Sequence, residues 1–244
     1  MKRALVTGGS GAIGAAICRT LAESGHHVYV HGYGHAADAQ RVAESIVAAG
    51  GSAETVLFDV ADRDAAANAV GHILDAGVVQ VLVNNAGTHD DAPFAAMTRA
   101  QWDRVIDVVL NGFFNVTQPL VMPMLRSRWG RIINIASVAA TMGNRGQANY
   151  AAAKAGLIAA GKSLSHEIAR KGVTVNAVAP GIIDTPMTAS VPKNPLFAQP
   201  EAVGRTIYRA IEKRKDVVYV PGFWALIMFV IRSVPEPIFK KLKL

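Results

Sequence analysis

Tyr150 and Lys154 stand four residues apart in an alanine-rich stretch, so a helix would place both side chains on one face. A free tyrosine has a pKa of about 10 and exchanges protons poorly near neutral pH. A nearby ammonium group stabilises the phenolate and brings that pKa towards the working range. The pair therefore predicts a proton-transfer centre in which Lys154 tunes Tyr150. The alternative is an amphipathic helix whose lysine extends along the surface.

Ser137 directly follows the predicted strand 131–136 and precedes Tyr150 by thirteen residues. In open α/β sheets, ligands bind beyond the carboxyl ends of the strands. A hydroxyl at such a strand end can hydrogen-bond a substrate carbonyl. Ser137, Tyr150 and Lys154 are therefore the predicted catalytic residues.

A glycine-rich turn, TGGSGAIG, covers residues 7–14 between a predicted strand and a predicted helix. Glycines let the backbone turn tightly and approach a pyrophosphate, whose charge then lies at the helix N-terminus. A glycine-rich turn alone is a weak signal, but its position after the first strand favours dinucleotide binding. The predicted cofactor contacts in this loop are Gly8, Gly9, Ser10, Gly11, Ile13 and Gly14.

The residues after the second predicted strand bear on cofactor preference. A carboxylate there would bind the ribose 2′-hydroxyl and repel a 2′-phosphate. The segment 31–35 reads HGYGH, and the first carboxylate is Asp38. NADP is therefore favoured, with NAD as the alternative, although no arginine or lysine occupies position 11.

Short apolar runs alternate with alanine-rich helical stretches along the whole chain. Such alternation predicts βαβ units with right-handed crossovers, and strands that are apolar throughout predict a parallel sheet covered on both faces. We therefore expect an α/β fold, a single Rossmann-type doubly wound domain with a seven-stranded parallel sheet and helices on both faces. The predicted strands are 4–7, 27–31, 53–58, 79–83, 131–136, 173–178 and 217–220, and the predicted helices are 12–24, 36–49, 62–75, 100–125, 148–171 and 200–214.

The chain has 244 residues, a single cysteine (Cys18) and a formal net charge of +7. Nothing indicates secretion or disulfides, so a cytoplasmic location is expected. Residues 193–244 carry ten Lys and Arg against four acidic residues, so nearly all the net charge lies there. This favours an anionic substrate or lipid surface over nucleic acid as the partner. The seven histidines lack metal-ligand spacing, and no metal site is predicted.

Several motifs together resemble the short-chain dehydrogenase/reductase family. They are Asn84-Asn85-Ala86-Gly87, Ser137, Tyr150-x-x-x-Lys154 and the segment NAVAPG at 176–181. The segment 141–157 is especially similar to bacterial 3-oxoacyl-[acyl-carrier-protein] reductases, and the likeness covers about residues 1–188. It implies a Rossmann fold, NADP-linked carbonyl reduction and a homotetramer or homodimer. Beyond the glycine loop it implies cofactor contacts from Tyr33, Asp59, Val60, Asn85, Ala86, Gly87, Tyr150, Lys154, Pro180, Gly181, Ile183 and Thr185.

The chain departs from the family in its long helix before the fifth strand. The family's additional catalytic asparagine aligns with Val109, not with Asn111. These positions differ by about 200° around a helix, so Asn111 cannot substitute without a change of register. Part of the family asparagine's role belongs to its backbone carbonyl, which holds a proton-relay water, and Val109 can retain that role. Activity is therefore expected, although a cofactor-binding protein without turnover is an alternative. The glycine spacing itself fits the nucleotide-sugar-modifying relatives, but the chain lacks the length for their substrate domain.

The C-terminal segment 223–244 is a second departure, because it resembles the tail of a membrane-associated branch of the superfamily. Residues 223–231 are all apolar and lead to Arg232 and a basic end, KKLKL at 240–244. Nine residues are too few to span a bilayer. The segment is expected either to lie at a membrane surface or to pack on the domain or a subunit. We therefore divide the chain into a reductase domain, 1–222, and a tail, 223–244.

The leading functional hypothesis is an NADPH-dependent reductase of 3-oxoacyl thioesters, carried by an acyl-carrier protein or coenzyme A. The basic C-terminal region can attract an acidic carrier protein. The tail favours a second hypothesis, a membrane-associated reductase of a lipid-linked or steroid-like ketone at the inner face of the membrane.

Overall fold

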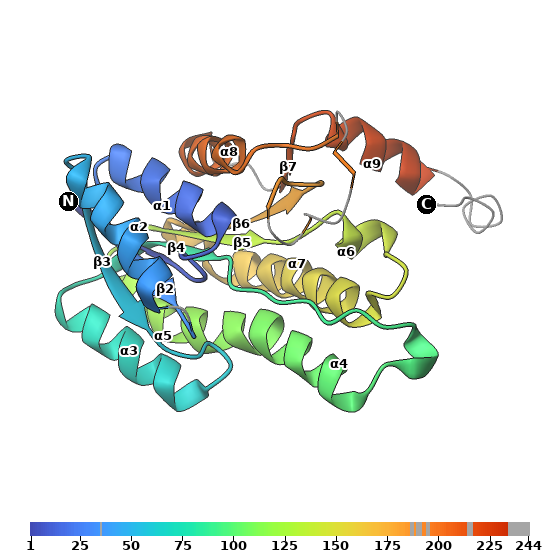
Figure 1. Cartoon of the computed structure of the whole chain (residues 1–244). Helices are drawn as coiled ribbons and strands as arrows, with labels where there is room; N and C mark the ends of the chain where they lie inside the picture. Colours follow the sequence, from blue (N-terminus) through green and yellow to red (C-terminus); the bar gives the residue numbers. More distant parts are fainter. Residues whose placement is uncertain (35, 186–187, 189–191, 194–195, 214–216, 234–244) are drawn as a thin grey trace.

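A computed structural model describes residues 1–34, 36–185, 188, 192–193, 196–213 and 217–233. It shows a seven-stranded sheet in the order β3-β2-β1-β4-β5-β6-β7, with every pair parallel (Figure 1). The strands are β1 (Lys2–Val6), β2 (His26–Gly32), β3 (Ser52–Leu57), β4 (Val79–Asn84), β5 (Gly130–Ile135), β6 (Val173–Pro180) and β7 (Val217–Val220). The strand order reverses between β1 and β4, which is where such sheets bind ligands. The predicted doubly wound α/β fold is confirmed.

Helices cover both faces of the sheet (Figure 1). One face carries α1 (Ala12–Glu23), α2 (Ala36–Ala48) and α8 (Pro200–Lys213), and the other carries α3 (Arg63–Asp75), α5 (Gly112–Arg126) and α7 (Ala148–Ile168). The remaining helical segments are η1 (Phe94–Ala96), α4 (Arg99–Ile106), η2 (Asp107–Asn111), α6 (Ala139–Met142), η3 (Ala169–Lys171) and α9 (Trp224–Ser233). The predicted helix 148–171 is thus α7 followed by η3, and residue 214 of the predicted helix 200–214 lies outside the described residues.

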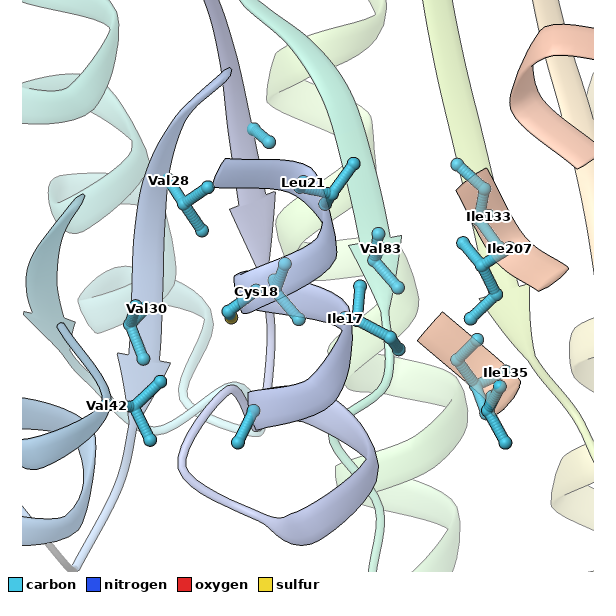
Figure 2. Packing of buried hydrophobic residues seen from close by; sticks show 14 of the residues in the cluster. Ile17, Cys18, Leu21, Val28, Val30, Val42, Val83, Ile133, Ile135 and Ile207 are labelled. Atoms are coloured by element: carbon cyan, nitrogen blue, oxygen red, sulfur yellow. The ribbon is translucent and has the colours of Figure 1, made fainter. Parts of the chain in front are cut away.

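Two apolar layers hold the helices to the sheet. On the first face, Ile17 and Leu21 of α1 and Ile207 of α8 pack against Val83 and Ile133 (Figure 2). The second face has a separate cluster that joins α3 and α5 to alternate residues of the same strands. Burial on both faces explains why runs such as residues 4–6 and 81–83 are apolar without alternation. Each fully buried aliphatic side chain of this kind stabilises the fold by about 1.5–3 kcal/mol.

The predicted helix 100–125 is three segments in sequence, α4, a π-helical turn η2 and α5. The helical stretch Arg99–Arg126 is long and apolar enough to cross a membrane by length and composition. However, Val116, Leu120 and Met124 are buried against the sheet and its neighbouring helices. In this structure the stretch is therefore a core helix of the domain.

The tail helix α9 packs beside β7 and α6 (Figure 1). Its side chains divide into two sets, since Trp224 and Met228 are 6% and 1% exposed, whereas Leu226 and Phe229 are each 68% exposed. A Cβ on Gly181 would lie 2.0 Å from Trp224 Nε1, so the indole rests directly on the backbone after β6. The basic end 240–244 lies outside the described residues.

Candidate active site

The glycine loop, residues 7–14, runs from the end of β1 into the first turn of α1 at the point where the sheet order reverses. Gly8 has φ +63°, a left-handed conformation that favours glycine, and its carbonyl accepts a hydrogen bond from the Gly11 N–H at 3.2 Å. A Cβ on Gly14 would lie 2.1 Å from the Gly8 oxygen, so only glycine lets α1 begin this close to the loop. The N-terminal N–H groups of α1 can then meet a pyrophosphate. Ala12 is the first residue of α1.

Asn85 ties the loop after β4 to the glycine loop. Its Nδ2 donates to the carbonyls of Thr7 and Gly8, both at 3.0 Å. The Thr7 hydroxyl accepts from the Asn85 and Ala86 N–H groups, also at 3.0 Å. The side chain of Asn85, predicted to contact the cofactor, is thus engaged in holding the glycine loop. Ala86 also lies against the glycine loop, since a Cβ on Gly8 would be 3.0 Å from the Ala86 Cα.

The ends of β2 and β3 bring the next predicted contacts to the same edge. Tyr33 follows β2 and is 64% exposed. Asp59 accepts a hydrogen bond from the Ala61 N–H at 2.8 Å, and Val60 is buried. Asn115 Nδ2 donates to the Val60 carbonyl at 2.9 Å, which fixes this turn against α5. Sequence reasoning missed the role of Asn115.

Ser137, Tyr150 and Lys154 lie together at the carboxyl edge of β5. Ser137 follows β5, whereas Tyr150 and Lys154 lie on α7 and share one of its faces. Tyr150 is hydrogen-bonded to Ser137, and Lys154 Nζ lies 5.7 Å from the centre of the Tyr150 ring. A Cβ on Gly87 would be 3.4 Å from Lys154 Nζ, so the Asn85–Gly87 turn borders the same group.

Burial governs the proton affinities of this group. It raises the pKa of Tyr150, an effect that the Ser137 hydrogen bond opposes and the negative charge of Asp91 reinforces. Burial lowers the pKa of Lys154 from 10.5 to about 8. Desolvation is thus the largest effect on the pKa of the Tyr150 phenol in the protein alone, and the lowering expected from Lys154 stays a prediction for the cofactor-bound site. Tyr150 therefore holds its proton at neutral pH, as a proton donor must.

The π-helical turn η2 bears on the aligned asparagine position. Val109 is 3% exposed, and its Cγ2 would lie 3.8 Å from a Cβ on Gly87. Asn111 is exposed and donates from Nδ2 to Asp107 Oδ1 at 2.7 Å. Val109 therefore faces the site and Asn111 does not, despite the change of helical register.

The segment after β6 holds the last predicted contacts. The Pro180 carbonyl accepts from the Val138 N–H at 3.1 Å, which joins this segment to the chain after Ser137. Thr188 Oγ1 donates to the Ile183 carbonyl at 2.5 Å and accepts from the Thr185 N–H at 3.2 Å. Thr188 thus shapes the turn that carries Ile183 and Thr185, a role that the sequence did not reveal.

Asn149 is a second residue that sequence reasoning missed. It is fully buried, and its Nδ2 donates to the carbonyls of Asp90 and Gln101 at 2.9 and 3.0 Å. Its Oδ1 accepts from the Tyr150 N–H at 2.8 Å. Asn149 therefore fixes the start of α7 against the 90–91 loop. The available signal was a polar residue directly before the tyrosine in an apolar helix.

The sequence matches a known family. Residues 2–196 match the family model described as short chain dehydrogenase. A 3-oxoacyl-[acyl-carrier-protein] reductase of Synechocystis sp. is 42% identical over 228 residues, which cover 90% of this chain and 92% of that protein. The reductase FabG of Aggregatibacter actinomycetemcomitans is 45% identical over 183 residues, covering 74% and 76%. That of Staphylococcus aureus (strain Mu50) is 45% identical over 188 residues, covering 77% and 76%. The chain therefore belongs to the short-chain dehydrogenase family and is a nicotinamide-dependent oxidoreductase.

Proposed function

We propose that the protein uses NADPH to reduce a 3-oxoacyl thioester to the 3-hydroxyacyl form. The observation that carries this proposal is the grouping of Ser137, Tyr150 and Lys154 at the sheet edge that also holds the glycine loop. Relatives that match most of the chain carry the name of 3-oxoacyl-[acyl-carrier-protein] reductases.

The proposed mechanism assigns one role to each side chain. Ser137 hydrogen-bonds the substrate carbonyl oxygen and orients it towards Tyr150. Tyr150 donates its phenolic proton to that oxygen as negative charge develops there. Lys154, held by the Ile135 carbonyl, places a positive charge below the Tyr150 ring and stabilises the phenolate that remains. The nicotinamide, when bound, supplies the hydride.

Preference for NADP is supported by the charges around the glycine loop. A cavity of about 430 Å³ borders the loop and is lined by Ser10, Arg19 and Arg41, together with two carboxylates. One of these, Asp38, is paired with Arg41 on α2. Arg41 and Asp38 thus neutralise each other, and Arg19 shares the lining with Glu201, so this lining carries no excess negative charge that would repel a 2′-phosphate. Together with the lack of a carboxylate at residues 31–35, this favours NADP over NAD.

An assay with acetoacetyl thioesters tests the reductase proposal. Purified protein would be mixed with NADPH or NADH and with acetoacetyl coenzyme A, acetoacetyl-carrier protein or simple ketones, following loss of reduced nicotinamide. We expect turnover of the thioesters and a higher kcat/KM with NADPH. Cofactor binding without turnover of any carbonyl would overturn the proposal and favour the cofactor-binding alternative.

The proposed macromolecular partners rest on the positive charge of the C-terminal region and on the resemblance to acyl-carrier-protein reductases. The basic region 193–244 is suited to an acidic carrier protein, and a homodimer or homotetramer in the cytoplasm is the proposed assembly. Light scattering of the purified protein gives the subunit number. If added salt raises the KM for the acyl-carrier-protein substrate but not the KM for the coenzyme A thioester, the result would support the carrier interaction.

The tail supports a second candidate, reduction of a lipid ketone at an anionic membrane. Trp224 and Met228 fix α9 to the domain, and Leu226 and Phe229 project apolar surface into solvent. The basic segment KKLKL, residues 240–244, follows α9 in the sequence. We propose the tail, 223–244, as the segment that contacts membrane.

Sedimentation with vesicles tests this role. Wild type should partition onto phosphatidylglycerol-containing vesicles, and the double variant Leu226→Glu/Phe229→Glu should remain in the supernatant. Val47→Glu provides a matched control, since Val47 of α2 is 55% exposed. Equal partitioning of all three proteins would exclude the tail as a membrane contact.

A further inference from the structure

His31, near the end of β2, is a buried histidine that links two loops of the cofactor site. It is 2% exposed. Its Nδ1 accepts a hydrogen bond from the Gly8 N–H at 2.9 Å, and its Nε2 lies 2.9 Å from the Phe58 carbonyl oxygen. An amide N–H only donates and a carbonyl only accepts, so both bonds require a neutral ring with its proton on Nε2.

The peptide group that His31 holds is central to the glycine loop. The Gly8 carbonyl accepts from the Gly11 N–H and from Asn85 Nδ2, so His31 completes the hydrogen bonding of this residue from the opposite side. At its other end the ring holds Phe58, which directly precedes Asp59 and Val60. The rings of His31 and Phe58 also meet edge to face, with centres 4.3 Å apart.

We propose that His31 is a positioning residue of the dinucleotide site, whose neutral ring holds the glycine loop and the end of β3 in the geometry that binds the cofactor. A second proton on the ring would place an N–H against the Gly8 N–H in a buried position, where neither donor has an acceptor. Acid should therefore release the glycine loop. The inference deepens the proposed function, because it concerns the cofactor site of the same reductase.

The surroundings of His31 favour the neutral ring. Burial lowers the pKa of His31 below its ordinary value, against the Phe58 hydrogen bond and the charge of Asp59, which both raise it. The glycine loop and β4 carry no charged side chain, and Glu54 of β3 contacts His27 instead. Lys2 and Arg3 of β1 lie at the opposite end of the strands. The pKa of His31 therefore lies below the ordinary value for histidine, and the ring is neutral at pH 7.

Calorimetric binding of NADP⁺ between pH 5 and 8 tests the inference, and NADP⁺ is chosen because NADPH decomposes in acid. His31→Gln retains one acceptor and one donor, His31→Leu retains neither, and His27→Gln is the control on the same strand. At pH 8 we expect His31→Leu to weaken binding about tenfold, with the other two variants close to wild type. At saturating cofactor, kcat should be unchanged in the control His27→Gln, whose wild-type side chain contacts Ser52 and Glu54 instead of the glycine loop.

The pH dependence separates positioning from general stability. Affinity of wild type should fall more steeply in acid than that of His31→Gln, since titration of the cofactor's own phosphate is common to both proteins. If His31→Leu does not fold, this comparison still decides the matter. Equal pH slopes for wild type and His31→Gln would overturn the inference. Because binding is measured without turnover, failure to reduce a thioester would count against the proposed function alone.

Discussion

Lys154 Nζ donates a hydrogen bond to the main-chain oxygen of Ile135 at 2.7 Å, so the last residue of β5 fixes the cation beside Tyr150. The end of β5 thus orients the Lys154 side chain of α7. Burial of the ammonium accompanies this contact and makes its charge sensitive to pH.

Activity should depend on the charge of Lys154. Burial lowers its pKa to about 8, so the ammonium predominates below that pH and the neutral amine above it. We expect kcat/KM for NADPH, which reports groups of the free enzyme, to decline as pH rises through about 8. Lys154→Arg stays charged and should lack this decline, whatever its absolute rate. The same decline in both proteins would show that another group is responsible.

Tyr150→Phe should remove the proton donor with little change in packing. We expect kcat to fall by about 10²–10⁴. The dissociation constant for NADP⁺ should stay within about twofold, since only a hydroxyl is lost. Steady-state assays and calorimetry measure the two quantities. Turnover equal to wild type would refute the assignment of Tyr150 as proton donor.

Val109→Asn should restore a polar group beside Gly87 and Lys154. We expect kcat to rise by on the order of a few-fold, because an amide there can hydrogen-bond within the proton-transfer site. The substitution buries an amide, so the free energy of unfolding should fall by about 1–3 kcal/mol. Asn111→Ala is the matched control and should leave kcat unchanged, because Asn111 is exposed and bonds Asp107. A lower kcat in Val109→Asn would contradict this prediction.

Gly14→Ala and Gly11→Ala should differ sharply. A Cβ at position 14 would lie 2.1 Å from the Gly8 oxygen, whereas one at position 11 would lie 3.6 Å from it, an ordinary contact. We expect Gly14→Ala to weaken NADP⁺ binding more than about tenfold and to destabilise the fold by about 1–3 kcal/mol. Gly11→Ala should stay within about twofold of wild type. Calorimetry and thermal unfolding check both quantities, and equal effects would mean that the close approach of α1 to the loop is unimportant.

Local sequence was sufficient to predict the sheet and the glycine loop. Strands buried on both faces carry apolar residues on both, as residues 4–6 and 81–83 do, and a loop that admits a helix start beside Gly8 must have glycine at position 14. The spacing of Tyr150 and Lys154 likewise requires only that a helix form. These features depend on neighbours in the chain.

Features that depend on contacts between distant segments were not predicted. Asn149 reads as an ordinary helix residue until the fold brings the Asp90 carbonyl to its amide. Asn85 was predicted as a cofactor contact, but its bond to the Thr7 carbonyl was not predicted. The π-helical turn η2 has no compositional signature in its sequence, DVVLN. The spacing of Tyr150 and Lys154 likewise does not reveal that burial raises the pKa of Tyr150, because burial is a property of the assembled domain.

The contact between Trp224 and Gly181 constrains how this tail can be exchanged between proteins. The indole occupies the space that any side chain at 181 would need. A chimera that carries α9 on another reductase therefore requires glycine at the position after the sixth strand. A side chain there would keep the indole of Trp224 from packing on the domain. The tail and the reductase domain must therefore be matched at one position, Gly181, which precedes Trp224 by more than forty residues.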